Sequence, residues 1–387
     1  MSCENPLILC INPGSTSTKI ALFRGTELQQ EAGISHSSED LKDFERIFEQ
    51  KEYRASHAMK FLADNGIELT DLSAVVGRGG MMKPVTGGTY EVNDVMLDDL
   101  QNYSLKYYGS EHISNLGAAL AKEIAHAANA KAYIVDPIST DDFTPVSRLS
   151  GVPEVERVSL MHSLNLRAKA RKVAQMTGTT FEQSNFVGCH LGGGISMAAF
   201  AKGRAIDSNH GLLGYGPFSP QRAGTLAISS VMDMCLSGEY TPSQLRKKFA
   251  KNSGFTGYLG TDDGREVMRM MDEGDELASA VFTAMAVQIA KEAAALSAVL
   301  KGDVKSVFIT GGLANAKRLT DMITEHVKFV APVHILPGED ELQAMSEGAV
   351  RALSGDEPPL TYKADDSLKA RLASPEKFKV LSSFNRG

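Results

Sequence analysis

The chain has no tryptophan, few cysteines and no long apolar run. Its four cysteines form no CxxC pair and are too few for a disulfide framework, which predicts reduced thiols as in the cytosol. The first residues lack a basic n-region and the apolar run after them is five residues long, so we expect no signal peptide. The most apolar helical stretch, 278–290, is shorter than a bilayer requires. These absences predict a cytoplasmic protein that does not bind a membrane.

Positive charge is outnumbered by negative charge, with 40 Lys and Arg residues against 47 Asp and Glu residues. The formal net charge is −7 and the pI is about 5.8, which argues against nucleic acid as the main partner. An anionic substrate must therefore be held by local cationic groups. With 387 residues the chain is long enough for two domains, since single cores stop growing near about 250–300 residues.

The N-terminal segment combines an apolar strand pattern with a turn of small and hydroxylated residues. Residues 7–11 are apolar, the string INPGSTSTK covers 11–19, and residues 20–23 are apolar again. This pattern predicts a tight hairpin whose tip offers N–H groups, hydroxyls and one ammonium to phosphate oxygens. It is not a Walker loop, because a second strand follows instead of a helix. Taken alone, such a turn is more often purely structural, so a second signal is needed.

That second signal is a repeat of the same strand–glycine turn–strand pattern later in the chain. The strand pattern 186–190 leads into Gly192, Gly193 and Gly194, and a further apolar strand pattern follows over 195–200. Gly14 and Gly192 lie about half a chain apart, too far for a solenoid repeat. The spacing predicts a duplicated α/β domain, each copy presenting a glycine hairpin to a shared cleft.

Other segments alternate between strand and helix character. Strands are predicted at 74–76, 89–92, 131–135 and 306–310, and helices at 111–129, 159–176 and 277–300, the last with a core-facing apolar stripe. The segment after Gly355 is predicted to be a loosely attached extension.

Five motifs together resemble the acetate and sugar kinase, chaperone ATPase and actin superfamily, and within it the butyrate kinase branch of the acetokinase family. They are INPGSTSTK, GRGGMMKP (77–84), CHLGGGIS (189–196), GPFSPQRAG (216–224) and ITGGLAN (309–315). The resemblance implies two ribonuclease H-like domains of the actin-like ATPase fold with an active-site cleft between them. It implies an N-terminal domain of residues 1–140 plus 345–387 and a nucleotide-binding domain of residues 141–344.

The reaction implied by the resemblance is reversible transfer of phosphate from ATP, with Mg²⁺, to a short carboxylate, most of all butyrate. Branched-chain acids (isobutyrate or isovalerate), propionate and acetate are alternatives, as is a regulatory ATPase module of the same superfamily. Acetate kinases usually carry Asn where this chain has Gly193, which favours the butyrate branch. Met161 stands where related kinases often carry Phe, which puts the shape of the acyl pocket in doubt. The resemblance also leads us to expect a homo-oligomer.

A carboxylate is already an anionic nucleophile at pH 7 and needs no general base, so catalysis must come from positioning and positive charge. Arg78 and Arg222 match the family's clamp on the substrate carboxylate and the γ-phosphate, where a bidentate guanidinium suits both partners. Met81 and Met82, beside Arg78, are candidates to line the acyl pocket. A sugar kinase would need an aspartate base, for which Asp136 is available, but the arginine pair would then have no role.

Three histidines and two carboxylates complete the candidate site by resemblance. His162 would donate to the transferring phosphoryl group, His190 would contact phosphate, and His112 would lie near the substrate; a packed structural role is the alternative for each. Asp136 would orient the catalytic groups. Mg²⁺ would be bound by Asn12 and Glu341. The neighbouring acids Glu339 and Asp340 are alternatives to Glu341 in this role. ATP would be bound by Ser15, Ser17, Lys19, His190, Gly192, Gly193, Gly194, Asp263, Arg265, Gly311 and Gly312.

Overall fold

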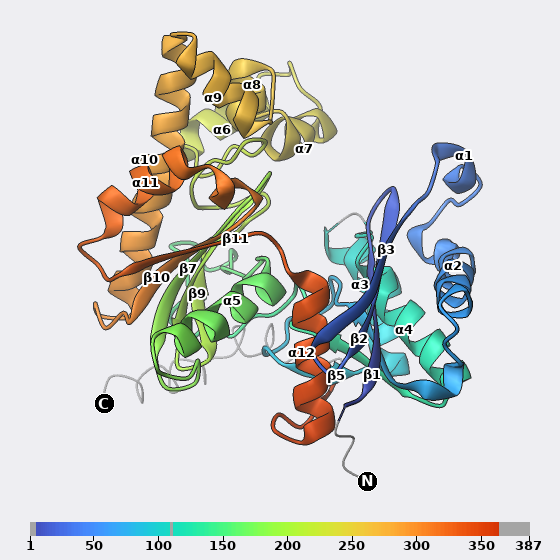
Figure 1. Cartoon of the computed structure of the whole chain (residues 1–387). Helices are drawn as coiled ribbons and strands as arrows, with labels where there is room; N and C mark the ends of the chain where they lie inside the picture. Colours follow the sequence, from blue (N-terminus) through green and yellow to red (C-terminus); the bar gives the residue numbers. More distant parts are fainter. Residues whose placement is uncertain (1–4, 109–110, 364–387) are drawn as a thin grey trace. The chain divides into compact units, whose positions relative to one another are not determined.

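The computed structural model describes residues 5–108 and 111–363 (Figure 1). The chain divides into two compact units, one of residues 1–140 with the chain from Asp340 on, the other of residues 141–339. The sequence placed the second boundary at 344/345. In the structure it falls at 339/340, ahead of helix α12 (Glu341–Ser354), because that helix packs on the sheet of the first unit.

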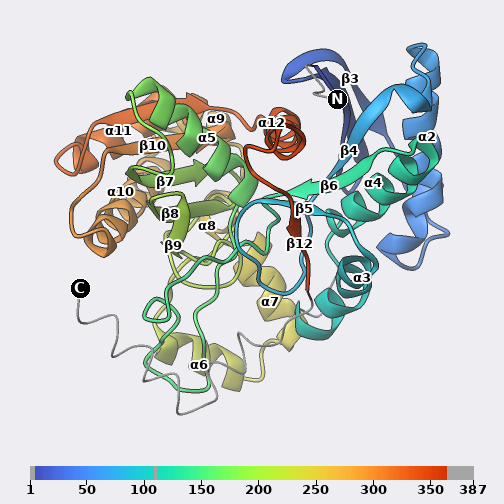
Figure 2. The same cartoon turned by 90° about the horizontal axis from the view of Figure 1, so that it is seen from below.

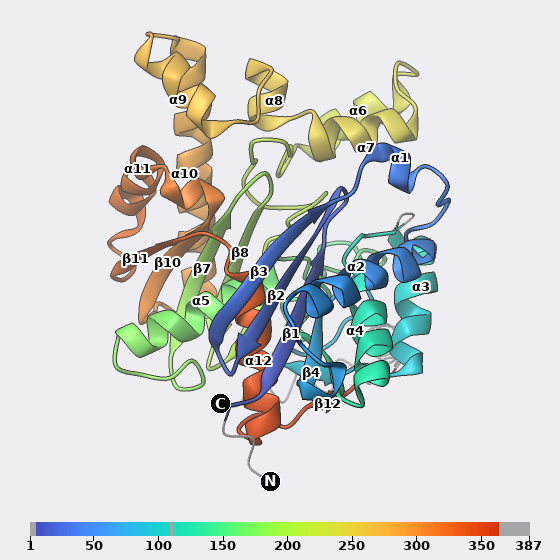
Figure 3. The same cartoon turned by 45° about the vertical axis from the view of Figure 1, so that its right-hand side comes forward.

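The first unit is built on a seven-stranded sheet with the order β12-β5-β6-β4-β1-β2-β3. β1 and β2 form the expected hairpin, β3 continues it antiparallel, and β4 and β6 run parallel to β1 (Figure 3). Its strands are β1 (Leu7–Pro13), β2 (Ser17–Arg24), β3 (Glu27–Ser35), β4 (Leu72–Arg78), β5 (Thr89–Glu91), β6 (Lys131–Val135) and β12 (Leu360–Thr361). Its helices are α1 (Ser38–Leu41), α2 (Lys51–Asp64), α3 (Asp94–Tyr108), α4 (Asn115–Ala128) and α12, with 3₁₀ turns η1 (Ile47–Gln50) and η2 (Leu69–Asp71).

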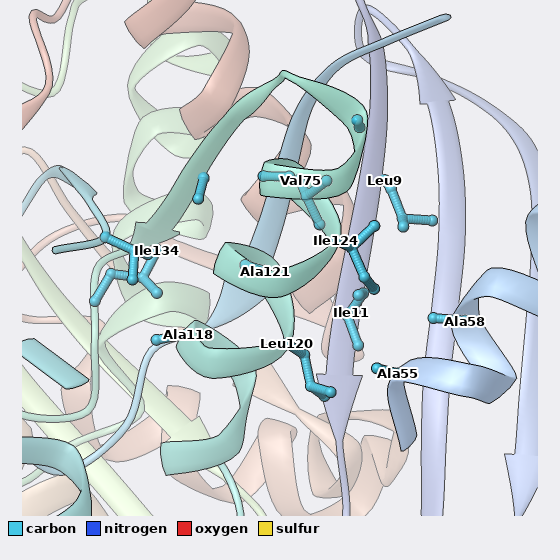
Figure 4. Packing of buried hydrophobic residues seen from close by; sticks show 14 of the residues in the cluster. Leu9, Ile11, Ala55, Ala58, Val75, Ala118, Leu120, Ala121, Ile124 and Ile134 are labelled. Atoms are coloured by element: carbon cyan, nitrogen blue, oxygen red, sulfur yellow. The ribbon is translucent and has the colours of Figure 1, made fainter. Parts of the chain in front are cut away.

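Alternation along the strands decides which side chains enter this core. Leu9 and Ile11 of β1 and Ile134 of β6 point toward α2 and α4, where Ala58 and Leu120 meet them (Figure 4). These side chains are almost fully buried, and each large aliphatic one contributes about 1.5–3 kcal/mol by leaving water. Helix α12 also packs against β1, β4 and β6.

The second unit repeats this topology on a five-stranded sheet with the order β11-β10-β7-β8-β9. β7, β8 and β9 form an antiparallel meander, and β10 and β11 run parallel to β7. The strands are β7 (Asn185–Leu191), β8 (Ile195–Ala201), β9 (Arg204–Ser208), β10 (Ser306–Gly311) and β11 (Val333–Pro337). The helices are α5 (Ser163–Met176), α6 (Ile228–Leu236), α7 (Pro242–Lys251), α8 (Gly254–Leu259), α9 (Gly264–Asp272), α10 (Glu276–Val299) and α11 (Lys317–Val327), with the 3₁₀ turn η3 (Gly312–Asn315).

Helices cover both faces of the second sheet (Figure 2). Val187 and Cys189 of β7 pack in the cluster under α10, and Phe186 packs in the cluster under α5. α10 is the one helix of the described part of the chain whose length and composition would allow it to cross a membrane. The expectation that this stretch is too short for a bilayer is therefore wrong by length. Phe282 and Ile289 of α10 are buried in the protein core, as in the core helix of a globular domain.

Two predicted helices begin later than the sequence suggested. α4 begins at Asn115 instead of Glu111, because the Glu111 carboxylate accepts hydrogen bonds from Arg46 and from the Ile47 amide. α5 begins at Ser163 instead of Ser159, because the preceding residues run extended and Leu160 forms a bridge with His210.

The segment after Gly355 is wrongly predicted as loosely attached, as far as the structure describes it. β12 pairs with β5, and Tyr362 is buried with its hydroxyl donating to Asp99. Asn93 donates to the Tyr362 carbonyl at 2.9 Å. Residues 364–387 lie outside the described part of the chain.

Candidate active site

The first unit brings Asn12, Arg78 and Glu341 together at the carboxyl ends of β1 and β4. Nδ2 of Asn12 donates to Oε2 of Glu341 at 2.6 Å, and Nη2 of Arg78 lies 3.0 Å from Oε1 of the same carboxylate. Of the three acids that the sequence left as rivals, Glu341 is therefore the one beside Asn12. It reaches this position because it opens α12, which packs on β1.

Arg78 is 4% exposed, and its Nη1 is buried without a hydrogen-bond partner among the described residues. Its flanking glycines explain how the chain can bury a guanidinium at this point. A Cβ at Gly77 would collide with the Gly117 carbonyl, and a Cβ at Gly79 would lie 2.6 Å from Cβ of Pro137. Asn115, which accepts from the Met81 amide at 2.7 Å, fixes the following loop. A buried donor without a partner is costly unless a ligand satisfies it.

Asp136 follows β6 directly and adopts a left-handed conformation, with φ of 39°. Its Oδ1 accepts from the Gly88 amide at 2.8 Å, and its own amide donates to the Gly88 carbonyl. A non-glycine residue in this region carries some backbone strain, which the two hydrogen bonds to Gly88 hold in place. His112 is exposed, and its Nδ1 lies 2.7 Å from Oγ of Ser114 at the start of α4.

Met81 and Met82 are both buried, and Met82 belongs to the core of the first unit. Their role as lining of an acyl pocket stays a prediction. In contrast to these two buried methionines, the tip of the β1–β2 hairpin is largely exposed to solvent. Ser15 and Lys19 are exposed and Ser17 is half-buried, so their polar groups are accessible to a ligand.

The second unit brings His162 and His190 into face-to-face contact, with ring centroids 4.0 Å apart and planes 8° apart. His190 is the penultimate residue of β7 and is 1% exposed, and its Nδ1 lies 2.7 Å from Nδ2 of Asn165. Nε2 lies 3.1 Å from Oε1 of Glu339 without hydrogen-bond geometry. His162 is the N-cap residue of α5, and its Nδ1 lies 2.8 Å from Oγ of Ser196.

Arg222 lies against the glycine hairpin of the second unit. A Cβ at Gly194 would collide with its guanidinium, and its Nη1 donates to the Gly211 carbonyl. Ser219 fixes this arrangement, since its Oγ donates to the Gly193 carbonyl at 2.6 Å and accepts from the Arg222 amide. Burial lowers the pKa of the Arg222 guanidinium from its ordinary value.

The predicted nucleotide residues lie in two loops that meet at Leu313. A Cβ at Gly264, next to Asp263 and Arg265, would lie 2.9 Å from the Leu313 side chain. Gly311 has φ of 89° and lies against the Leu191 backbone, so only glycine fits there, whereas Gly312 faces open space. Asp263 caps α9 and pairs with Arg265 at 2.7 Å, and this pairing lowers the pKa of Asp263 to about 2. Both residues thus have a local structural role at the start of α9, and their contact with the nucleotide stays a prediction.

Three positioning residues were missed by the sequence reasoning: Asn165, Ser196 and Arg54. Asn165 follows His162 by one helical turn, a spacing that places both side chains on one helix face. Arg54 shares the buried face of α2 with Ala55 and Ala58, a periodicity that could have drawn attention to a buried cation. Ser196 gave no signal apart from its place after the glycines.

Within the described residues no three His, Cys, Asp or Glu side chains form a cluster able to hold a metal ion. Mg²⁺ typically takes one or two protein carboxylates and keeps its remaining positions for water and phosphate. Glu341, whose carboxylate accepts from Nδ2 of Asn12, supplies one carboxylate of the kind that this sparse donor set requires.

Comparison with known proteins gives two findings. Residues 161–349 match the model of the acetokinase family. Solved structures with the same fold include acetate kinase from Porphyromonas gingivalis (TM-score 0.73, 16% identity, covering 90% of this chain and 99% of that one) and a propionate kinase from Francisella tularensis subsp. tularensis SCHU S4 (0.70, 17%, 89% and 98%). Acetate kinase from Entamoeba histolytica is similar as well (0.70, 17%, 88% and 98%).

These matches confirm the predicted fold class, a mixed α/β protein with two sheets of the actin-like ATPase fold. The expected cleft between the domains stays a prediction. Residues 161–349 thus match the acetokinase family, and the chain has the fold of the acetate and propionate kinases named above.

Proposed function

We propose that this chain transfers the γ-phosphoryl group of ATP to a short-chain carboxylate, giving an acyl phosphate and ADP. The observation that carries the proposal is Arg78, a buried arginine with Nη2 on Glu341 and Nη1 without a partner among the described residues. A substrate carboxylate supplies the anionic acceptor that this nitrogen lacks. The acetokinase match over 161–349 and the names of the acetate and propionate kinases of the same fold support the same chemistry.

The residues fit a reaction in which two anions must approach each other. The carboxylate is ionised at pH 7, so the protein has to orient it and neutralise charge rather than remove a proton. In the proposal Arg78 binds the carboxylate, and Arg222 and His162 donate to the transferring phosphoryl oxygens. His190, whose Nδ1 is held by Asn165, contacts phosphate in this proposal.

The remaining candidate residues serve the nucleotide and its metal. The tip residues Ser15, Ser17 and Lys19 bind phosphate, and Gly192 to Gly194 bind it with their backbone. Glu341 and Asn12 would hold Mg²⁺ near the nucleotide, where the ion would supply positive charge against the phosphates. His112 contacts the substrate acid.

Asp136 serves as an orienting group in this proposal. Its Oδ1 is engaged by the Gly88 amide, which supports positioning rather than the proton abstraction that a sugar kinase requires. ADP release that does not depend on any added carboxylate would instead favour a regulatory ATPase module.

We infer butyrate as the preferred acid, with isobutyrate, isovalerate, propionate and acetate as the alternatives. Steady-state assays with C2 to C6 acids, in which hydroxylamine traps the acyl phosphate, test two assignments. One is that the chain is a carboxylate kinase, and the other is that butyrate is its preferred acid. We expect butyrate to be preferred over acetate. If acetate is used at least as well as every C4 and C5 acid, the butyrate assignment fails while the carboxylate kinase assignment stands. If no acid gives a hydroxamate, the whole proposal fails.

The proposal includes association of copies of this chain. Helix α6 has no buried residue, and Ile228, Met232 and Leu236, spaced four apart on one face, are 78%, 55% and 80% exposed. An apolar stripe of this kind is typical of a protein interface. Analytical ultracentrifugation of the native chain and of a double variant with Ile228→Asp and Leu236→Asp tests this association. The native chain should have a molecular mass above that of a monomer, and the variant should have a lower mass than the native chain.

A further inference from the structure

We infer that Arg54 is a positioning residue for phosphate binding: its buried guanidinium holds the carbonyls of the β1–β2 hairpin tip inward, so that the tip presents N–H groups, hydroxyls and Lys19 to the anion. This inference rests on the proposed function of the hairpin. Arg54 lies on α2, 35 positions beyond Lys19, and its side chain is 0% exposed.

The contacts of Arg54 converge on the tip. Nη1 donates to the carbonyls of Gly14 and Ser17, both at 3.0 Å, and to Oγ1 of Thr18 at 2.8 Å. Nη2 donates to the Ser15 carbonyl at 3.3 Å. One guanidinium therefore holds three carbonyls of a four-residue turn.

The fourth carbonyl of the turn, that of Thr16, accepts from the His36 amide at 2.8 Å. All four carbonyls from Gly14 to Ser17 are thus occupied by donors from the protein. A carbonyl oxygen turned toward a phosphate would repel it, whereas amide hydrogens attract it. Holding the carbonyls inward determines which end of each peptide dipole is available to the ligand.

The geometry requires an arginine. Nε donates to Oε1 of Gln50 at 3.0 Å, so the planar group is oriented on one side by Gln50 and on the other by the tip. A lysine ammonium could replace the charge but could not span several carbonyls and a glutamine in one plane. No carboxylate pairs with Arg54 in the described contacts, and burial lowers the pKa of its guanidinium from the ordinary value. The buried cation is balanced by carbonyl dipoles, and its charge adds to the attraction of the tip for phosphate.

The test measures ATP affinity directly by titration calorimetry, together with the KM values for ATP and for the acid and the melting temperature. For Arg54→Met we expect ATP affinity to fall at least about tenfold, on the scale of losing one charge-assisted contact. The KM for the acid should change less than twofold. Arg54→Lys should recover the melting temperature more fully than the ATP affinity.

The matched control is Arg167→Met. Arg167 is also a buried arginine that donates to a turn carbonyl, that of Gly203, but this turn joins β8 to β9 at the far end from the glycine hairpin. The control should lower the melting temperature and leave ATP affinity unchanged. Equal losses of ATP affinity in both variants would mean that Arg54 acts only through stability, and would overturn the inference.

Two further outcomes are decisive. ATP affinity of Arg54→Met, or of Arg54→Lys, within twofold of the native chain would overturn the inference. If Arg54→Met does not fold, Gln50→Leu is the substitute, because it removes only the hydrogen-bond partner of Nε. We expect Gln50→Leu to reduce ATP affinity by a smaller factor than Arg54→Met. An unchanged ATP affinity in that variant would contradict the inference. Because affinity for ATP is measured without turnover, failure of this inference is distinct from failure to form an acyl phosphate.

Discussion

The imidazole rings of His162 and His190 stack at a centroid distance of 4.0 Å although they belong to different elements, the start of α5 and the end of β7. Ser196 and Asn165 occupy one nitrogen of each ring, at 2.8 and 2.7 Å. The stack thereby fixes two nitrogen donors or acceptors in parallel planes. Such preorganisation lets hydrogen bonds act on developing charge without rearrangement.

Replacing His162 by Ala should reduce kcat by about 100-fold, the scale of losing one transition-state donor, with a smaller effect on the KM for ATP. Ser196→Ala keeps the ring and removes only its partner, so we expect a loss of about tenfold or less. Hydroxamate formation under saturating substrates measures both. A Ser196→Ala loss as large as that of His162→Ala would show that the ring contributes little beyond structure.

Arg78→Ala and Arg222→Ala should each reduce turnover by at least about 100-fold, because each removes a cation from a reaction between two anions. Arg78→Lys should remain strongly impaired, since an ammonium cannot contact Glu341 and a carboxylate in bidentate fashion. Near-normal turnover of either alanine variant would refute the clamp. Circular dichroism should establish that both variants are folded.

Gly194→Ala tests the packing of Arg222 on the second hairpin. The new methyl group would collide with the guanidinium and displace it, so activity should fall by about tenfold or more. Gly193→Ala is the matched comparison, because its Cβ would lie 3.6 Å from Gln221, an ordinary contact distance. Activity assays of both variants should rank Gly194→Ala as the more damaging, and the reverse order would contradict the placement of Arg222.

Stability should fall as the solution becomes acidic, in part because of His36. Burial first, and then the charges of Arg54 and His57, lower the pKa of His36 to about 4, against 6.5 for an unperturbed histidine. Above pH 6.5 both states hold a neutral ring. Between pH 6.5 and about 4 the unfolded chain binds a proton that the folded chain does not, so the free energy of unfolding decreases as pH falls.

Urea denaturation of the native chain and of His36→Gln at pH 7 and pH 5 measures this dependence. We expect the native chain to lose more stability between the two pH values than His36→Gln. The exposed His326 on α11 provides the control, and His326→Gln should keep the native dependence. An unchanged pH dependence in His36→Gln would exclude His36 as its source.

Several local elements of this protein were predicted correctly from the sequence alone. The apolar runs at residues 7–11 and 20–23 flank a turn that can only reverse the chain, so the β1–β2 hairpin and its echo at β7–β8 followed from residue pattern. The duplicated α/β fold was predicted from the repeated strand and glycine pattern, and the candidate catalytic groups Arg78, Arg222, His162 and His190 were named from motifs that resemble those of a kinase family. Strand periodicity and glycine turns are local properties.

The tertiary structure decided which distant groups meet. Glu341 is 329 residues from Asn12 and contacts it only because α12 returns to the first sheet. Arg54 reaches the hairpin tip because α2 packs beneath it, and the segment from Gly355 to Lys363 is held because β12 pairs with β5 and Tyr362 is buried against Asp99. Such contacts depend on how helices pack on sheets. This packing is determined by the burial of whole helix and sheet faces, which no short run of residues specifies.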